Sequence, residues 1–177
     1  MKSFLLSLVV FVVFYGVLPA GASEWDCAST SGTFERSTDC TMGDEVAVSG
    51  DLTVTGKETV YSTLTAASGK RHFKITSGAH RVSLKWLRLT GGNVGFGEGG
   101  SIYVKDVAAH LNISHCVFFN NRAGGNGGAL FLSYGSFSSF FNSSLVSNTA
   151  GEGGGGIFIY GSSSSPSFLD MSSVTLQ

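Results

Sequence analysis

The stretch Gly127-Gly128-Ala129-Leu130 decides the fold, because related stretches occur twice more in the chain. They are Gly99-Gly100-Ser101-Ile102 and Gly154-Gly155-Gly156-Ile157. The apolar residues that end the three stretches are 28 and then 27 positions apart. A nearly constant period of this length is typical of a solenoid, in which each repeat forms one turn of a coil.

A second apolar pattern precedes the glycine stretches and returns after the last one. Positions 1, 3, 6 and 8 are apolar in three copies: Val82, Leu84, Leu87, Leu89; Leu111, Ile113, Cys116, Phe118; Leu169, Met171, Val174, Leu176. The step from position 1 to position 3 is the alternation of a β-strand. The change of phase between positions 3 and 6 predicts two short strands that meet at a bend and face one interior. A weaker copy has Phe140 and Leu145 at two of these positions but Ser138 and Ser143 at the others.

Asparagine stands three positions after the second strand in two copies, at Asn121 and Asn148. Successive turns of a coil stack about 4.8 Å apart, so equivalent residues lie over one another. A stacked asparagine can bond to its neighbours' amides and tolerates left-handed turn dihedrals. We expect Gly127 and Gly128 to supply the positive φ values of the next corner. These four residues are therefore the predicted ladder and turn residues.

One repeat thus predicts about three short strands and three corners, which form one rung of an all-β, parallel β-helix with about five rungs. No rung can bury its own inner face, so only stacking stabilises the array. Residues 169–176 begin a further rung that the chain does not complete. We therefore expect the repeats to be truncated at the C-terminus, and we expect end-to-end self-association through the open end.

The residues of the central repeat resemble a known family. Phe118-Phe119-Asn120-Asn121, followed by Gly127-Gly128-Ala129-Leu130, resembles the paired FxxN and GGA[ILV] repeats of the polymorphic outer membrane proteins. More broadly, residues 82–177 resemble the right-handed parallel β-helix, pectin-lyase-like superfamily. The resemblance implies a right-handed, single-stranded solenoid, here assigned to residues 46–177. That superfamily contains lyases, hydrolases, adhesins and surface proteins, so the fold alone does not specify an activity.

The N-terminus has the features of a secretory signal peptide over residues 1–22. Lys2 supplies the positive charge, residues 4–18 are mainly apolar, and Ala20-Gly21-Ala22 is a typical cleavage site. The apolar run is shorter than the stretch of about 20 residues that spans a bilayer. We therefore expect a secreted, extracellular or cell-surface protein with no membrane span after signal cleavage.

An exported chain can form disulfides and acquire glycans. We expect Cys27 and Cys40 to pair and to brace an N-terminal cap over residues 23–45. Cys116 occupies an inward position of the repeat, which predicts a buried thiol. Asn112 and Asn142 begin the sequons Asn-Ile-Ser and Asn-Ser-Ser, and we expect both on outward strand positions as glycosylation sites in a eukaryotic host.

Composition and motifs exclude several function classes. Charged residues make up 13% of the chain and the formal net charge is −1, which predicts no nucleic-acid partner. Gly95, Gly97 and Gly100 fit the spacing of a dinucleotide-binding loop, but a strand follows them where a helix is required. We therefore expect no cofactor.

A metal site is also not expected. Glu98 and Asn126 occupy the same place in successive repeats, and Glu152 lies one residue away from that place in the next repeat. Two rungs separate the glutamates by about 9.6 Å. One calcium ion with ligands at about 2.3–2.6 Å cannot bridge that distance.

The remaining polar residues leave two functions open. Four acids fall on scattered positions: Asp44, Asp51, Asp106 and Asp170. A basic and aromatic strip is either a contact for sugar or polyanion or an ordinary charged strand face: Arg81, Lys85, Trp86 and Arg88. We expect a non-catalytic adhesion or recognition scaffold whose partner is surface carbohydrate or another protein. The alternative is the N-terminal fragment of a polysaccharide lyase or glycoside hydrolase whose active rungs lie beyond Gln177.

Overall fold

The computed structural model describes residues 22–105 and 108–177. All but the last residue of the predicted signal peptide, residues 1–22, lies outside the described residues. Asp106 also lies outside them. No helix among the described residues is long and apolar enough to cross a membrane.

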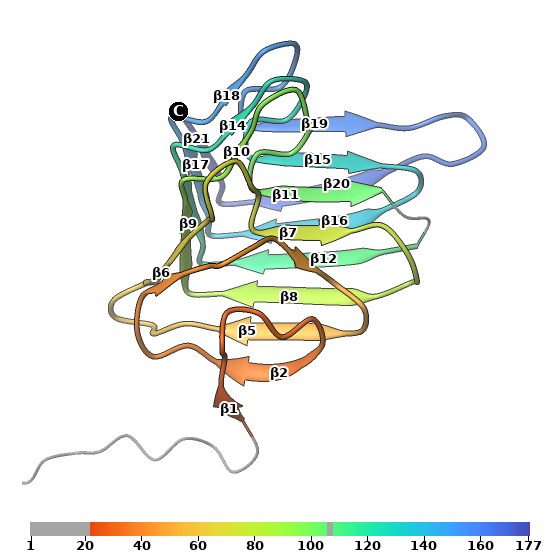
Figure 1. Ribbon diagram of the computed structural model, residues 1–177. Coiled ribbons are helices and arrows are strands. Elements are labelled where there is room, and N and C mark those ends of the chain that lie inside the picture. The colour runs from red at the N-terminus through yellow and green to blue at the C-terminus, as the bar shows by residue number, and fades with distance from the viewer. Residues whose placement is uncertain (1–21, 106–107) are drawn as a thin grey trace, which may run out of the picture.

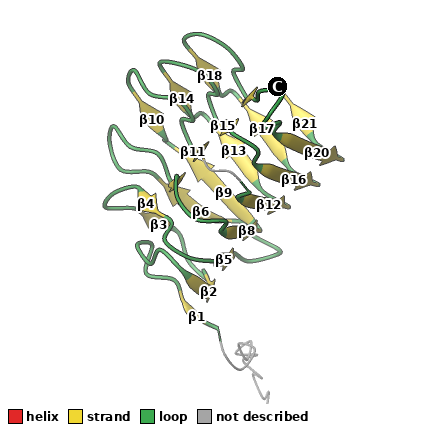
Figure 2. Ribbon diagram, turned by 90° about the vertical axis from the view of Figure 1, so that its right-hand side faces the viewer, coloured by secondary structure: helices red, strands yellow, loops and turns green. Residues whose placement is uncertain are grey.

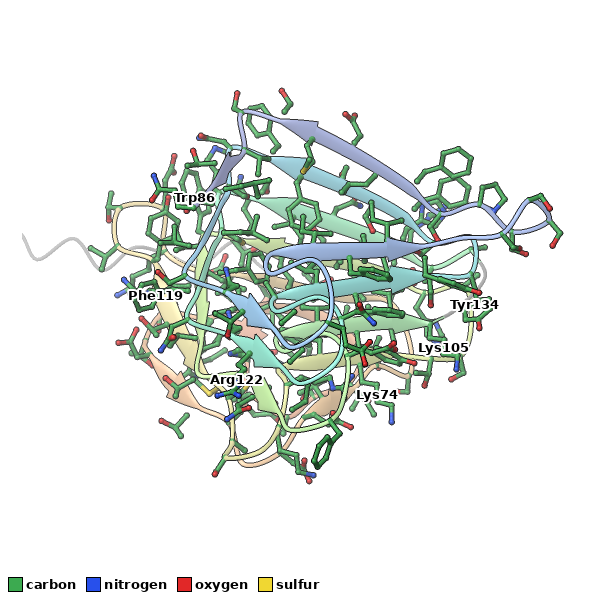
Figure 3. The ribbon with its side chains drawn as sticks, turned by 90° about the horizontal axis from the view of Figure 1, so that it is seen from above. Lys74, Trp86, Lys105, Phe119, Arg122 and Tyr134 are labelled. Atoms are coloured by element: carbon green, nitrogen blue, oxygen red, sulfur yellow. A yellow bond between two sulfur atoms is a disulfide. The ribbon has the colours of Figure 1, made fainter. Side chains whose placement is uncertain are left out.

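The chain folds into a parallel β-solenoid of about five turns, as the repeats predicted. Figure 1 shows the strands stacked in layers, with the rungs following one another from the N-terminus to the C-terminus. Seen from the C-terminal end, the chain turns counter-clockwise as it rises toward the viewer (Figure 3), which makes the coil right-handed. The predicted all-β, parallel β-helix is therefore confirmed.

Four parallel sheets run along the solenoid. Sheet 1 contains β1 (Ser23–Glu24), β2 (Gly32–Glu35), β5 (Leu52–Thr55), β8 (Arg81–Lys85), β12 (His110–Ser114), β16 (Phe137–Phe141) and β20 (Phe168–Ser172). Sheet 2 contains β3 (Cys40–Thr41), β6 (Ser62–Thr65), β9 (Leu87–Thr90), β13 (Val117–Phe119), β17 (Ser144–Val146) and β21 (Thr175–Leu176). Sheet 3 contains β10 (Asn93–Val94), β14 (Arg122–Ala123) and β18 (Thr149–Ala150). Sheet 4 contains β4 (Val46–Ala47), β7 (Phe73–Ile75), β11 (Ile102–Lys105), β15 (Leu130–Ser133) and β19 (Ile157–Tyr160).

A complete rung visits the sheets in the order 1, 2, 3 and 4, as β8, β9, β10 and β11 do. The short strand of sheet 3 is an addition to the three strands predicted for each repeat. Ile102 pairs in register with Leu130, and Leu130 pairs with Ile157. The glycine stretches therefore stack on one another, as their period predicts.

The predicted bend between the first two strands is a single residue with left-handed backbone dihedrals. It is Trp86 in one rung, His115 in the next and Asn142 in the third, with φ values of 56°, 53° and 45°. One such residue reverses the alternation, so the side chains at positions 1, 3, 6 and 8 all point inward. Because asparagine accepts these dihedrals more readily than most residues, Asn142 suits the bend better than a strand position.

The inward side chains of sheets 1, 2 and 4 form one continuous core. The rung that contains β16 and β17 differs, because Ser138 and Ser143 occupy inward positions and are buried. Ser143 Oγ accepts a hydrogen bond from the Cys116 N–H at 3.0 Å and donates one to the Phe141 carbonyl at 2.9 Å. Ser138 Oγ has no hydrogen-bond partner among the described residues. The core is therefore least apolar in this rung.

Residues 23–45 join the solenoid through two strands. β2 pairs in parallel with β5, and β3 pairs in parallel with β6. Trp25 is fully buried, and its ring lies 5.8 Å from the ring of Phe73. The predicted disulfide between Cys27 and Cys40 is present. A separate N-terminal cap is not confirmed.

Candidate ligand-binding groove

The two ladder asparagines form a continuous row of side-chain amides along the inside of one corner. Asn121 is buried, and its Nδ2 donates to the Leu89 carbonyl at 3.1 Å and to Asn148 Oδ1 at 3.0 Å. The Gly92 N–H donates to Asn121 Oδ1 at 3.0 Å, and Asn148 Nδ2 donates to the Phe118 carbonyl at 2.9 Å. Each amide therefore satisfies backbone groups of the rung below it.

The left-handed dihedrals of this corner lie one residue earlier than expected. Asn120 and Ser147 have φ values of 54° and 55°, whereas Asn121 and Asn148 do not have positive φ. The stacked asparagines therefore bond to neighbouring amides as predicted, but the residue before each of them makes the left-handed turn.

The two glycines of the repeat have different reasons to be glycine. Gly127 has a φ of 69°, as expected, but Gly128 does not have positive φ. A Cβ atom on Gly128 would lie 2.6 Å from the Thr149 backbone nitrogen and would also collide with the Gly155 carbonyl oxygen. The predicted reason for Gly128 is therefore wrong, because close stacking of rungs requires glycine at this position.

The predicted modification residues occupy two different environments. Asn112 is exposed on an outward position of β12, and its Oδ1 accepts a hydrogen bond from Ser139 Oγ at 2.9 Å. Asn142 is also exposed, but it lies in the bend between β16 and β17, so its expected strand position is wrong. Cys116 is buried as expected, and its Sγ lies 3.5 Å from the Leu84 carbonyl oxygen. Burial raises the pKa of this thiol to about 12, so the thiol is protonated at neutral pH.

A hollow of about 600 Å³ lies on the outward face of sheet 4 and is here called the groove. Its lining includes Arg71, Lys74, Phe96, Glu98, Tyr103 and Glu152. The segments that contain β10, β14 and β18 project from one edge of the coil (Figure 2). Residues 91–101 connect β9 to β11, whereas the shorter segment 66–72 connects β6 to β7. The segment 91–101 therefore overhangs the rung below it, which has no projecting segment.

Tyr103 lines the groove and is supported by a neighbouring ring and by the half-buried Arg71. The ring of Tyr103 lies 5.4 Å from that of Phe131, and the Arg71 guanidinium lies 4.8 Å from the centre of the Tyr103 ring. Arg71 also donates to the Glu98 carbonyl at 2.9 Å and forms an ion pair with Glu45 at 3.1 Å. These contacts connect the projecting segment to sheet 4, so the shape of the groove is fixed by side chains of two rungs.

Phe96 is the most unusual side chain of the groove. It is fully exposed, and it lies at the edge of the groove between Gly95 and Gly97. Aromatic side chains normally bury a large apolar area, so a fully exposed ring indicates a contact surface. The flanking glycines place no side chain beside the ring.

Charged groups of both signs surround this ring. Glu98 and Glu152 line the groove together with Lys74 and Lys105. Asn126 Nδ2 donates to Glu152 Oε2 at 2.9 Å, so two members of the predicted outer ladder do meet. No group of three His, Cys, Asp or Glu side chains in the described part of the chain could hold a metal ion. The groove therefore offers hydrogen-bond donors and acceptors without a strong net charge.

Sequence reasoning missed His72, which lies beneath the groove. His72 is fully buried, and its Nε2 lies 3.0 Å from the Leu64 carbonyl oxygen and 3.1 Å from that of Thr90. Carbonyl oxygens only accept hydrogen bonds, so Nε2 bears the proton, and Nδ1 accepts from Ser101 Oγ at 2.9 Å. Burial lowers the pKa of His72 to about 4. In an alignment of the repeats, Phe73 matches Ile102, and His72 therefore matches Ser101. This match would have indicated that His72 occupies an inward corner position.

The candidate acids are not brought together. Asp44 pairs with Lys70 at 2.8 Å, and Asp51 accepts the backbone N–H of Arg81 at 2.8 Å. Asp170 lies on β20, at the C-terminal end of sheet 1. The carboxylates therefore occupy separate surfaces, and Asp44 and Asp51 have structural partners.

The fold and the groove define a class of protein, a parallel β-solenoid with an open lateral groove. No family model, curated protein or solved structure matches this chain. The resemblance to the pectin-lyase-like superfamily and to polymorphic outer membrane protein repeats is therefore supported by the fold alone.

Proposed function

We propose that this protein is a non-catalytic, extracellular or cell-surface recognition scaffold that binds carbohydrate in the groove. The observation that supports this most strongly is the fully exposed Phe96 at the edge of a hollow of about 600 Å³. The disulfide between Cys27 and Cys40 is compatible with an oxidising, extracellular environment.

A saccharide suits the chemistry of the groove better than an apolar ligand does. The C–H groups of a sugar ring pack on an aromatic face, and Phe96 offers such a face to solvent. Sugar hydroxyls both donate and accept hydrogen bonds, which matches the ammonium group of Lys74 and the carboxylates of Glu98 and Glu152. The groove is a hollow on the surface of the solenoid, so it can accept one part of a longer chain.

Binding to a panel of neutral and acidic oligosaccharides, measured by calorimetry, tests this proposal. Phe96→Ser should weaken the binding of the best ligand by up to about tenfold, because a stacked aromatic side chain contributes about 0.5–1.5 kcal/mol. Phe168→Ser is the matched control, since it removes a half-exposed phenylalanine from sheet 1. If no saccharide binds, or if both variants bind like the parent protein, the proposal is wrong.

The alternative function, a polysaccharide lyase or glycoside hydrolase, predicts turnover. Incubation of the purified protein with the bound polysaccharide, followed by assays for reducing ends and unsaturated products, distinguishes the two. The recognition scaffold predicts an intact polymer. Release of either product above the level of heat-denatured protein would favour the enzyme.

A further inference from the structure

The predicted basic and aromatic strip separates into two parts in the structure. Arg81 lies at the N-terminal end of β8, whereas Lys85, Trp86 and Arg88 lie together around the bend between β8 and β9. We call these three residues, with Phe119 and Arg122 of the next rung, the basic corner. Figure 3 shows Trp86, Phe119 and Arg122 on one side of the molecule and the labelled groove residues on the opposite side.

Aromatic rings support two cations of the basic corner. Lys85 Nζ lies 5.6 Å from the centre of the Trp86 ring, and the Arg88 guanidinium lies 4.5 Å from the centre of the Phe119 ring. Both cationic side chains are exposed, and both rings are half-buried. A ring beneath a long cationic side chain limits its rotamers while its charge stays accessible to an anion.

These cations are not neutralised by ion pairs. Within residues 22–105 and 108–177, the ion pairs involve the cations Arg36, Lys70, Arg71 and Lys74. None involves Lys85, Arg88 or Arg122. The acids in register with this corner, Glu35 below Lys85 and Asp39 below Arg88, both lie two rungs away. The Asp39 carboxylate accepts the Thr63 N–H at 2.7 Å. In the groove, by contrast, Glu45 pairs with two of the cations, Arg71 and Lys74.

We propose that the basic corner binds an acidic polysaccharide. Arg88 and Arg122 belong to successive rungs and to neighbouring sheets, so the positive charges continue from one rung to the next around the corner. Separate cations of this kind fit a polymer with repeated anionic groups better than a single anion. Thr63, Thr65 and Thr90 lie half-buried on outward positions of sheet 2 and offer hydroxyl groups to a polyhydroxyl ligand. The guanidinium of Arg88 can donate two parallel hydrogen bonds to a carboxylate or a sulfate.

Retention on immobilised heparin and immobilised alginate, with dextran as the neutral control, tests this inference. The protein should bind both polyanions at low ionic strength and elute as salt rises, because the contacts are exposed and screened. The double variant Lys85→Gln, Arg88→Gln should lose affinity by about tenfold, since each exposed pair contributes up to about 1 kcal/mol. Arg88→Lys should show a smaller loss, because it keeps the charge but not the planar group on Phe119.

The matched control is Lys70→Gln, Arg81→Gln, which removes two cations that belong neither to the groove lining nor to the basic corner and keeps the same net charge as the test variant. It should bind both polyanions like the parent protein. Equal losses in the two double variants would overturn the inference, as would failure of the parent protein to bind either polyanion. Equal affinity for polyglutamate or duplex DNA would assign a general polyanion surface and not a polysaccharide site. Circular dichroism of each variant verifies that the β-structure is retained.

Discussion

At the residue scale, single polar side chains inside the coil satisfy backbone groups that the corners leave free. Asn121 and Asn148 serve one corner through their amides, and His72 serves the next corner through its imidazole. The backbone partners hold each asparagine amide in one orientation, and burial keeps the His72 imidazole neutral. Removal of one leaves buried carbonyl or amide groups without a partner, which costs about 1–3 kcal/mol per group.

His72 makes the stability of the protein depend on pH. Its folded pKa of about 4 lies below the ordinary value of 6.5, so the unfolded chain binds the proton more readily. The contribution of the neutral imidazole is complete above about pH 6.5 and is lost as the pH falls toward 4. Over that range His72 should reduce the free energy of unfolding by about 3 kcal/mol.

Urea unfolding at several pH values measures this effect. His72→Gln keeps a side chain that can donate to the Leu64 and Thr90 carbonyls but does not titrate. Carboxylates also titrate near the lower end of the range and affect both proteins alike. The effect of His72 is therefore the difference in the free energy of unfolding between the parent protein and the variant at each pH. If the variant and the parent protein lose stability equally between pH 6.5 and 4, the assignment of this effect to His72 is wrong.

At the element scale, the strands are short and gain their stability from exact repetition of the rungs. The three glycine stretches stack in register, so the corner of one rung lies directly against the backbone of the next. At this corner the dihedral angles require glycine at position 127, and the backbone of the neighbouring rung excludes a side chain at position 128. The same repetition made the inward residues of sheets 1, 2 and 4 predictable from alternation and period alone.

Gly128→Ala tests the close approach of rungs. The added Cβ atom would collide with backbone atoms of Thr149 and Gly155, which belong to the following rung. Overpacking against backbone should lower the free energy of unfolding by about 3 kcal/mol. Gly43→Ala is the matched control, because a Cβ atom there meets no atom within 4 Å. Thermal unfolding of the two variants should therefore differ clearly, and equal melting temperatures would contradict the role assigned to Gly128.

At the scale of the whole molecule, the two ends of the solenoid differ in how far their apolar side chains are buried. Trp25 is buried against Phe73 near the N-terminal end. In the last rung, the inward side chains of Ile159, Met171 and Leu176 are 43%, 45% and 58% exposed. They line a hollow of about 590 Å³ beside the strand edges of β19, β20 and β21.

The 177-residue chain is therefore expected to self-associate through this end in a concentration-dependent manner. Apolar side chains and free strand edges both favour pairing with another chain. Met171→Lys with Leu176→Lys should shift the sedimentation coefficient toward that of the monomer. Phe137→Lys with Phe168→Lys on the lateral face of sheet 1 should leave the association unchanged. A parent protein that stays monomeric over a wide concentration range would contradict this expectation.

The coil and the inward residues of its strands could be predicted from the sequence, because they repeat with a fixed period and alternate along each strand. The disulfide could be predicted because Cys116 falls on an inward repeat position, which leaves Cys27 and Cys40 to pair. Four features could be recognised only after the rungs were stacked in three dimensions: the groove, the buried role of His72, the position of Asn142 in a bend and the reason for Gly128. Each of these depends on contacts between rungs, such as that of Arg71 with Tyr103. Stacking sets the distance between rungs, and no local pattern in the chain states which side chains it brings together.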